Sequence, residues 1–481
     1  MAGPSFQELL AENRQLRQRV AEQQRTIEQQ QRTIEQLQQA IRQLHERLDA
    51  AERAAKRQAA PFSKGEPKER PKRPGRKKGE KHGRHGHRPP PPENKVDEVL
   101  EGSLPCECPN CRGAVEATHV DVQYQTDIPR EPIHRQINIH CGRCRACDKS
   151  VRGRHPQQTS NATGAAASQV GPDAQAAVAY LNKHSGMSHG KISDYFDKCH
   201  GIKLTRGAAA QIVLRTGRRL EPAYQEIKQQ LRDANHLTPD ESGWRVGGRP
   251  AWVHAWVADN GATGYAIDPR RGAAALQEVL GADWYGTMTH DGYSSYDTQF
   301  PDAVHQQCVD HAMRRARSLR DQQRGRARQF PCQVLQLFSE ALKARDRILA
   351  KELDGPERDG AHEHFVGRLL DLTERPRTNA ANELFAKHLY GHGEQWLMFL
   401  NDPTIPATNH RAEQALKTPI VNRKVWGGNR TWNGARAQEI TTSVLQTCRN
   451  LAKDIVNYVS HALRGFLGHL FPPPARNPTG R

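Results

Sequence analysis

The chain has 481 residues, enough for two or three domains, and its 71 Lys and Arg against 53 Asp and Glu give a formal charge of +18. This balance favours a polyanionic partner. No apolar run approaches the length of a membrane span, and the polar, Gln-rich N-terminus does not resemble a signal peptide. We therefore expect a cytoplasmic protein whose ten cysteines are thiols or metal ligands, not disulfides.

Residues 6–51 repeat with a period of seven, and the segment QQRTIEQ occurs twice in succession. Ile and Val at one core position with Leu at the other favour a parallel two-stranded coiled coil, in which Asn13 would help to fix the register. We predict self-association through residues 1–57. The alternative is a single amphipathic helix that packs on the body of the protein.

Residues 58–95 are rich in Pro, Gly, Lys, Arg and His and offer almost nothing to bury. From residue 61 to residue 95, twelve Lys or Arg stand against four Glu, so this segment supplies +8 of the total charge. Such a composition predicts a disordered linker that attracts phosphate non-specifically. A merely solubilising linker is the alternative.

Two clusters of three cysteines lie about thirty residues apart. They are Cys106, Cys108 and Cys111 in the first cluster and Cys141, Cys144 and Cys147 in the second. Because each C-x2-C pair presents two thiolates, two pairs complete a tetrahedral zinc site and leave no position open for catalysis. Residues 96–158 therefore predict a structural zinc ribbon, with a hairpin at residues 120–139. A redox pair is the alternative.

Residues 159–232 read as helices. The segment HGKISDYFDKCHGIKLTRGAAAQIV is compatible with a helix-turn-helix, whose turn lies near Gly201 and whose second helix begins at about Arg206. This pattern also occurs in proteins that never bind DNA. The segment either contacts a DNA duplex or serves as a packing bridge to the domain that follows.

Two short motifs each carry an aspartate where an apolar or β-branched run gives way to Gly and Ser. They are LTPDESGW with Asp240 and GTMTHDGY with Asp291. An acid at the end of a strand is positioned for chemistry, because the strand holds its backbone while the side chain projects past the sheet. Residues 250–258, between the motifs, are apolar on both alternating faces, as in a strand covered on two sides. The two aspartates can therefore converge; the alternative is that each only supports a turn.

The segment after Asp291 is strongly basic. Residues 303–309 predict a further strand, and residues 312–328 contain seven arginines against one acid, which favours phosphate contact over an ordinary solvated face. Residues 330–400 then show helical periodicity with little strand signal. Farther on, VNRKVWGGNRTWNGAR mixes Arg and Lys with two tryptophans and glycines, a composition suited to backbone contact and base stacking.

A third carboxylate lies in residues 407–418, which predict a short helix that stops at Pro419. Four of its residues share one face: Asn409, Ala412, Glu413 and Leu416. That face is expected to turn inward, where a Glu is uncommon unless it binds a cation. The alternative is a surface ion pair of Glu413 with Lys417.

The motifs PDES, HDGY, CVDHAMRR and NHRAEQAL, followed by VNRKVWGGNRTWNGARAQE, carry a resemblance. From about residue 104 onward the chain resembles the transposases of insertion sequence family sixty-six, which are DDE-type enzymes of bacterial mobile elements. The resemblance implies that Asp240, Asp291 and Glu413 are the catalytic triad. One departure is Asp310, where a neutral residue is expected before His311.

The resemblance implies a multidomain fold: a coiled coil, a zinc ribbon, a helical DNA-binding segment and an α/β RNase H-like catalytic core. The core would comprise residues 233–318 and 406–481, with residues 319–405 as a helical insertion. The three carboxylates would hold two Mg²⁺ (or Mn²⁺) ions for strand cleavage and strand transfer. Because CDKSVRGRHPQ resembles the family's zinc-ribbon exit, the expected structural Zn²⁺ ligands are Cys108, Cys111, Cys144 and Cys147.

The partners implied are double-stranded DNA at the element ends and at the target, a second copy of the chain in a dimer or higher oligomer, and accessory transposon proteins. A nucleoid-associated place in a bacterial cytoplasm follows from these partners. The alternative function is a catalytically inactive, DNA-binding transposase derivative that acts as a repressor.

Overall fold

A mixed five-stranded sheet organises the larger of the two units of this computed structural model, Pro90–Arg481; the smaller unit is Met1–Pro89. The structure describes residues 6–56, 90–100, 105, 110–114, 122–126, 128, 131–164, 169–353 and 355–472. Within these ranges no helix has the length and apolar character needed to cross a bilayer.

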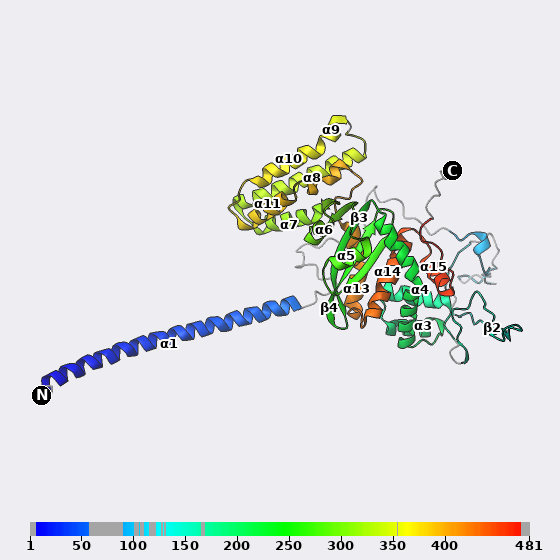
Figure 1. The fold of residues 1–481 in the computed structure, drawn as a ribbon, viewed down its shortest axis with the longest axis horizontal. Coiled ribbons are helices and arrows are strands. Elements are labelled where there is room, and N and C mark those ends of the chain that lie inside the picture. The colour runs from blue at the N-terminus through cyan, green and yellow to red at the C-terminus, as the bar shows by residue number, and fades with distance from the viewer. Residues whose placement is uncertain are drawn as a thin grey trace. The chain divides into compact units, whose positions relative to one another are not determined.

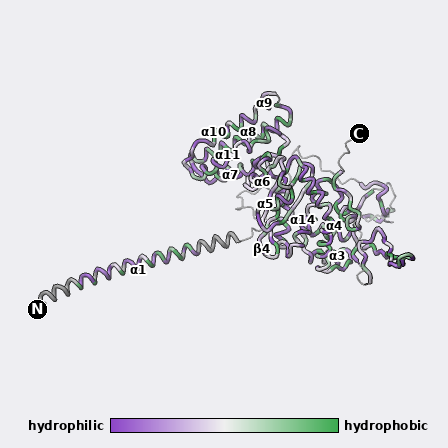
Figure 2. Tube along the Cα trace, in the orientation of Figure 1, coloured by the Kyte–Doolittle hydropathy of each residue, from purple (hydrophilic) through white to green (hydrophobic). Residues whose placement is uncertain are grey.

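The smaller unit contains one long helix, α1 (Phe6–Lys56), which confirms the helix predicted from the heptads. Hydrophilic residues predominate along it (Figure 2). Its described apolar heptad side chains are 52 to 61% exposed: Leu16, Val20, Ile27, Ile34, Leu37, Ile41 and Leu44. An exposed apolar seam is what a second helix would cover, and the pairing itself stays a prediction. Most of the predicted linker, residues 58–89, lies outside the described residues.

The sheet has the strand order β5-β4-β3-β6-β7 (Figure 1). The strands are β3 (His236–Val246), β4 (Arg249–Ala258), β5 (Thr263–Asp268), β6 (Thr287–His290) and β7 (Val304–Gln307). The first three form an antiparallel meander, whereas β6 and β7 run parallel to β3. Strand β4 is buried on both faces over most of its length, and β7 is the predicted extra strand. A mixed sheet with covering helices is compatible with the predicted α/β core.

Helices cover both faces of the sheet. Leu237 and Met288 lie in one apolar cluster with α4 (Arg206–Arg232), α5 (Ala273–Leu280) and α14 (Trp432–Asn450). Trp244 and Val246 lie in another cluster with Leu416 of α13 (His410–Trp426). Because side chains alternate along a strand, odd-numbered residues of β3 face α4 and α5, and even-numbered residues face α13.

Helix α14 also protects the edge strand β5. Three of its side chains, spaced four apart, accept hydrogen bonds from backbone N–H groups of β5: Glu439 from Ile267 (2.8 Å), Ser443 from Tyr265 (2.9 Å) and Thr447 from Thr263 (3.0 Å). An uncovered edge would offer these donors to another chain. The polar face of α14 therefore covers the edge of the sheet at β5.

Helices α2 (Pro172–Lys183), α3 (His189–His200) and α4 come directly before the sheet. Gly201 ends α3 in the left-handed conformation, and α4 begins at Arg206 after the capping residue Thr205, as predicted. Helix α4 then continues into the core, where a Cβ on Gly217 would lie 2.8 Å from Cα of Ala437. This close helix crossing supports the packing-bridge alternative, and DNA contact by the pair stays a prediction.

The helices between β7 and α13 have an apolar core of their own. They are α7 (Val309–Gln322), α8 (Gln329–Leu349), α9 (Gly355–Asp359), α10 (Ala361–Glu374), α11 (Ala380–His392) and α12 (Met398–Asn401). Buried Val309 and Ala316 of α7 belong to this core, so the predicted boundary at residue 318 falls inside a helix that packs with the insertion. Helix α15 (Ile455–Arg464) follows α14.

Two predicted boundaries were wrong. Strand β3 does not end at Asp240; it continues to Val246 because residues 240–246 pair with β4. Helix α13 does not stop at Pro419. Proline removes the N–H that would bond to the carbonyl of Ala415, and the hydroxyl of Tyr265 donates to that oxygen instead (2.8 Å).

The cysteine segment contains a short hairpin, β1 (Cys141–Arg143) with β2 (Ser150–Arg152). The hairpin predicted at residues 120–139 is wrong for the part that the structure describes, which has no strand there. The apolar residues described there, Val122, Tyr124, Ile128 and Ile133, are exposed, so burial does not favour a hairpin. Backbone hydrogen bonds between Cys144 and residues 148 and 149 instead bring β1 and β2 together. Cys106 and Cys108 lie outside the described residues.

Candidate active site

Asp240 in β3 and Asp291, directly after the end of β6, belong to two neighbouring parallel strands. His236 of β3 pairs with Thr287 of β6, and Leu237 pairs with Met288. Each aspartate is four residues beyond the first of these pairs, so the same register brings the two carboxylates side by side. Neighbouring strands are about 4.8 Å apart, and residues at one level point to the same face. The predicted convergence of the two motifs is therefore what the sheet register dictates.

Glu413 comes to this place from α13, which packs on the even-numbered face of β3, the face of Asp240. Asn409, Ala412 and Leu416 are buried, and Glu413 lies at the rim of the same helix face with 34% of its side chain exposed. Its negative charge raises the pKa of Asp240. The sheet and α13 thus bring together three acids that lie up to 173 residues apart in the sequence.

Burial and neighbouring negative charges dominate the electrostatics of the two aspartates. Burial raises the pKa of Asp240 to about 7, and the charges of Asp291, Glu241 and Glu413 add to the shift. Burial also raises the pKa of Asp291, again with a contribution from Glu241. A cluster of this kind gains free energy when a divalent cation enters, because the cation relieves both the repulsion and the desolvation.

Helix α7 supplies basic side chains that contact Glu413. The guanidinium of Arg314 lies 2.8 Å from the carboxylate of Glu413 and 3.0 Å from that of Asp310. Arg314 also donates to Nε2 of His311, which lies 3.8 Å from Glu413. The predicted alternative, a Glu413–Lys417 pair, does not form within the described ion pairs of Glu413. Asp310 instead serves as a second partner of Arg314.

His311 is the histidine whose neighbour departs from the family pattern. Burial lowers the pKa of its imidazole, and the adjacent Arg314 lowers that pKa further. Asp291 and Glu413 act in the opposite direction, which places both carboxylates within electrostatic reach of the ring. The structure therefore adds His311 to the surroundings of the acids.

Glu241 is a buried carboxylate that sequence reasoning missed. Only 1% of its side chain is exposed, and it accepts hydrogen bonds from Arg271 and from the hydroxyl of Tyr296. The guanidinium of Arg271 also lies over the ring of Tyr293, 4.0 Å from its centroid. Strand alternation places Glu241 on the opposite face from Asp240. The acid was visible in the motif PDES, but its partners come from residues 30 and 55 positions away.

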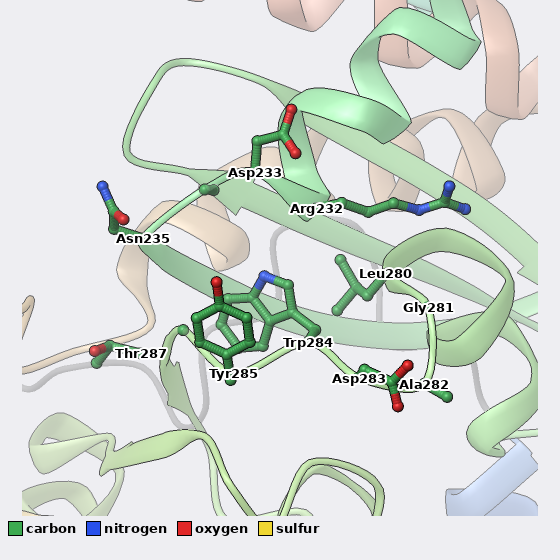
Figure 3. A pocket seen from close by; sticks show the side chains of 12 residues that line it. Arg232, Asp233, Asn235, Leu280, Gly281, Ala282, Asp283, Trp284, Tyr285 and Thr287 are labelled. Carbon is green, nitrogen blue, oxygen red and sulfur yellow. The ribbon is translucent and has the colours of Figure 1, made fainter.

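A hollow of about 710 Å³ lies at the other end of the sheet (Figure 3). Its lining includes Asn235 and Thr287, which precede or begin the parallel strands, together with Trp284 and Tyr285. The aspartates lie at the opposite ends of the same strands. The hollow contains none of the three predicted catalytic acids, so it belongs to a different part of the surface.

The cysteines that the structure describes are free thiols. Cys141 lies in β1, Cys144 and Cys147 lie in the turn before β2, and Cys111 is exposed. Backbone N–H groups of residues 146 and 147 lower the pKa of Cys144, and its thiol also interacts with that of Cys147. A lowered thiol pKa in a C-x2-C turn fits a metal-binding knuckle. Cys108, one of the four predicted ligands, lies outside the described residues.

Comparison with known proteins identifies the family. Residues 167–437, more than half of the chain, match the family described as "Transposase IS66 family". The chain is also 24% identical over 318 residues to an uncharacterized protein, y4hP, of Sinorhizobium fredii; the match covers 58% of this chain and 56% of that protein. The chain thus matches little more than half the length of this relative. The matched family region contains Asp240, Asp291 and Glu413, and the chain belongs to the IS66 family of transposases.

Proposed function

We propose that the protein is a DDE-type transposase in which Asp240, Asp291 and Glu413 form the catalytic triad. The observation that carries the proposal is the parallel register that sets Asp240 level with Asp291 under the helix bearing Glu413. The raised pKa values of both aspartates support it, because perturbed carboxylates cluster where a charged substrate or cofactor is bound. Membership of a transposase family supplies the substrate class, DNA.

The residues fit a pair of hard divalent cations. Three carboxylates provide the oxygen ligands that Mg²⁺ or Mn²⁺ prefers, and their mutual repulsion favours positive charge at the site. Two bound ions would activate the attacking water or 3′-hydroxyl and stabilise the leaving 3′-oxygen. Asp240, held on a strand, and Glu413, held on a helix, would fix the ligand positions. No covalent protein intermediate is required.

Arg314 would exchange partners when the site is loaded. In the metal-free chain its guanidinium pairs with Glu413, so Glu413 must leave this pair to bind a metal ion. Asp310, 3.0 Å away, can then hold the arginine, or the arginine can turn to a DNA phosphate. The exposed Arg317 and the half-buried Arg320, farther along α7, continue the basic surface. We propose that α7 contacts the DNA backbone next to the scissile bond.

We further propose that the core is RNase H-like. The central strand β3 has an antiparallel meander on one side and two parallel strands on the other, and the acids come from β3, from the end of β6 and from a later helix. The helices α7 to α12 enter between the second and third acids, where the insertion was predicted. This arrangement keeps the acids together while the insertion folds around its own core.

The remaining segments would serve DNA binding and assembly. Cys108, Cys111, Cys144 and Cys147 would hold a structural Zn²⁺ in a ribbon that helps to bind the element ends. The apolar seam of α1 would pair two copies, so that two element ends are held together, and accessory transposon proteins would act with them. The exposed Trp432, at the start of α14, would offer a base-stacking surface.

A strand-transfer assay separates this function from the alternative, a catalytically inactive repressor. Purified full-length protein would be incubated with Mg²⁺ and with DNA that carries the inverted repeats flanking its gene. Cleavage at the element end, followed by joining of the 3′-end to target DNA, is the expected result. Binding to the same DNA without any cleavage in Mg²⁺ or Mn²⁺ would instead support the repressor.

A further inference from the structure

A second group of metal-binding side chains lies beside the sheet, on the face opposite to the carboxylates. His290 ends β6, His305 lies in β7, and Asp297 lies in α6 (Ser294–Gln299). Because His305 pairs with Met288, and His290 pairs with Gln307, the two histidines are diagonal neighbours on one face. That is the face of Met288 and of Tyr296, whose ring packs against the imidazole of His290.

The three ligand atoms converge. Nε2 of His290 lies 3.0 Å from Nδ1 of His305, and Oδ1 of Asp297 lies 3.9 Å from the first nitrogen and 3.7 Å from the second. A tetrahedral ion with bonds of about 2.0 Å holds its ligand atoms about 3.3 Å apart. The observed separations bracket that value, so small side-chain movements would complete three corners of a tetrahedron.

The burial of the group is not explained by the hydrogen bonds of the protein. His290 is fully buried, and His305 is 7% exposed. Oδ1 of Asp297 is also buried and has no hydrogen-bond donor among the residues that the structure describes. An unpartnered carboxylate oxygen that faces two buried imidazoles is unfavourable unless a cation lies between them.

We propose that His290, Asp297 and His305 bind a structural divalent transition-metal ion, Zn²⁺ by preference, separate from the proposed Mg²⁺ site. Two imidazoles and one carboxylate favour Zn²⁺ over Mg²⁺, which prefers an all-oxygen shell. His305 is already oriented for this role, because its Nε2 donates to the carbonyl of Phe300 (2.9 Å) and leaves the unprotonated Nδ1 as the potential ligand atom. A water molecule would complete the coordination.

Binding of the ion would change the tautomer of His290. In the metal-free chain Nδ1 of His290 accepts from the N–H of Gly292 at 3.2 Å, and Nε2 donates to His305. Binding through Nε2 moves the proton of His290 to Nδ1, so both of these hydrogen bonds are given up in exchange for metal–ligand bonds and a paired Asp297. The ion would tie β6, α6 and β7 together and stabilise the turn that carries Asp291.

The variant Asp297→Asn removes a negative charge and disturbs the fold little. The Asn side chain has the same shape as Asp, and Oδ1 of Asp297 makes no hydrogen bond with the described residues that the change could break. Full-length wild type and variant would be purified with Zn²⁺, freed of loosely held metal and analysed for elements. The variant is expected to hold one Zn²⁺ fewer per chain and to lose the Zn²⁺-dependent rise in melting temperature. The matched control Asp302→Asn, an exposed aspartate nearby, should retain both. Equal zinc content in wild type and Asp297→Asn would overturn the proposal.

A spectroscopic arm keeps the test valid if Asp297→Asn fails to fold. Full-length Cys144→Ser protein, in which the proposed ribbon site is disrupted, would be titrated with Co²⁺. A visible d–d band without a thiolate charge-transfer band is the expected signature of an imidazole and carboxylate site. Absence of that band in folded Cys144→Ser protein would contradict the proposal independently of Asp297.

Discussion

At the residue scale, the raised pKa of Asp240, a proposed metal ligand, makes the stability of the folded protein depend on pH. The pKa of Asp240 is about 7 in the folded, metal-free protein, whereas its ordinary value is 3.8. The folded chain therefore holds this proton more tightly than the unfolded chain. The stability that the protonated group contributes is fully present below about pH 4 and is lost as the pH rises through about 7.

Asp240→Asn should consequently stabilise the metal-free protein at alkaline pH. We expect the free energy of unfolding at about pH 8 to rise by roughly 2 to 4 kcal/mol, with little change near pH 4. Chemical denaturation in a chelator at the two pH values measures the difference. Mg²⁺ should stabilise the wild type at about pH 8 but not the variant. Equal stability of the two proteins in chelator at that pH would contradict the assigned electrostatics.

The sequence indicated the three acids because each stands in a local pattern: Asp240 and Asp291 at the end of an apolar run, and Glu413 on a helix face. Glu241 and Arg314 were not assigned in this way. The partners of Glu241 lie 30 and 55 residues away, and Arg314 contacts an acid 99 residues away. A single sequence carries no local signal for such contacts.

At the element scale, the sequence predicted where α3, α4 and β7 lie, because capping residues and strand patterns are local. The sequence misplaced the end of α13. Proline is expected to stop a helix because it leaves the carbonyl four residues earlier without a hydrogen-bond donor. Tyr265, from a strand 150 residues earlier, satisfies that carbonyl. It also ended β3 at Asp240, because pairing with β4 decides the length of that strand.

The crossing of α4 and α14 makes a prediction with an internal control. A Cβ at Gly217 would lie 2.8 Å from the backbone of Ala437, so Gly217→Ala should destabilise the protein by about 1 to 3 kcal/mol. At Gly207, an exposed position near the start of the same helix, a Cβ would meet only a distant hydroxyl. Gly207→Ala should be neutral or stabilising by up to about 1 kcal/mol. Thermal melts of both variants would refute the close crossing if they shifted equally.

At the scale of the whole molecule, the larger unit encloses the proposed triad, and α1 presents an unpaired apolar seam. Deletion of residues 1–57 should therefore convert the protein from a dimer or higher oligomer to a smaller species. The larger unit should keep its fold, because its own described residues build its four apolar clusters. Light scattering measures the mass, and circular dichroism checks the fold. An unchanged oligomeric state after the deletion would show that α1 does not mediate self-association.

The central claim is that Asp240, Asp291 and Glu413 act as one metal-binding unit, to which a helix contributes Glu413. The most direct test is Mg²⁺-dependent cleavage of an element end by Glu413→Gln, with Asp310→Asn as the control, since both acids pair with Arg314. Glu413→Gln should lower cleavage by at least about 100-fold while DNA binding persists, and adding Asp240→Asn should cost little more. Asp310→Asn should remain active. Cleavage by Glu413→Gln at the wild-type rate would contradict the triad.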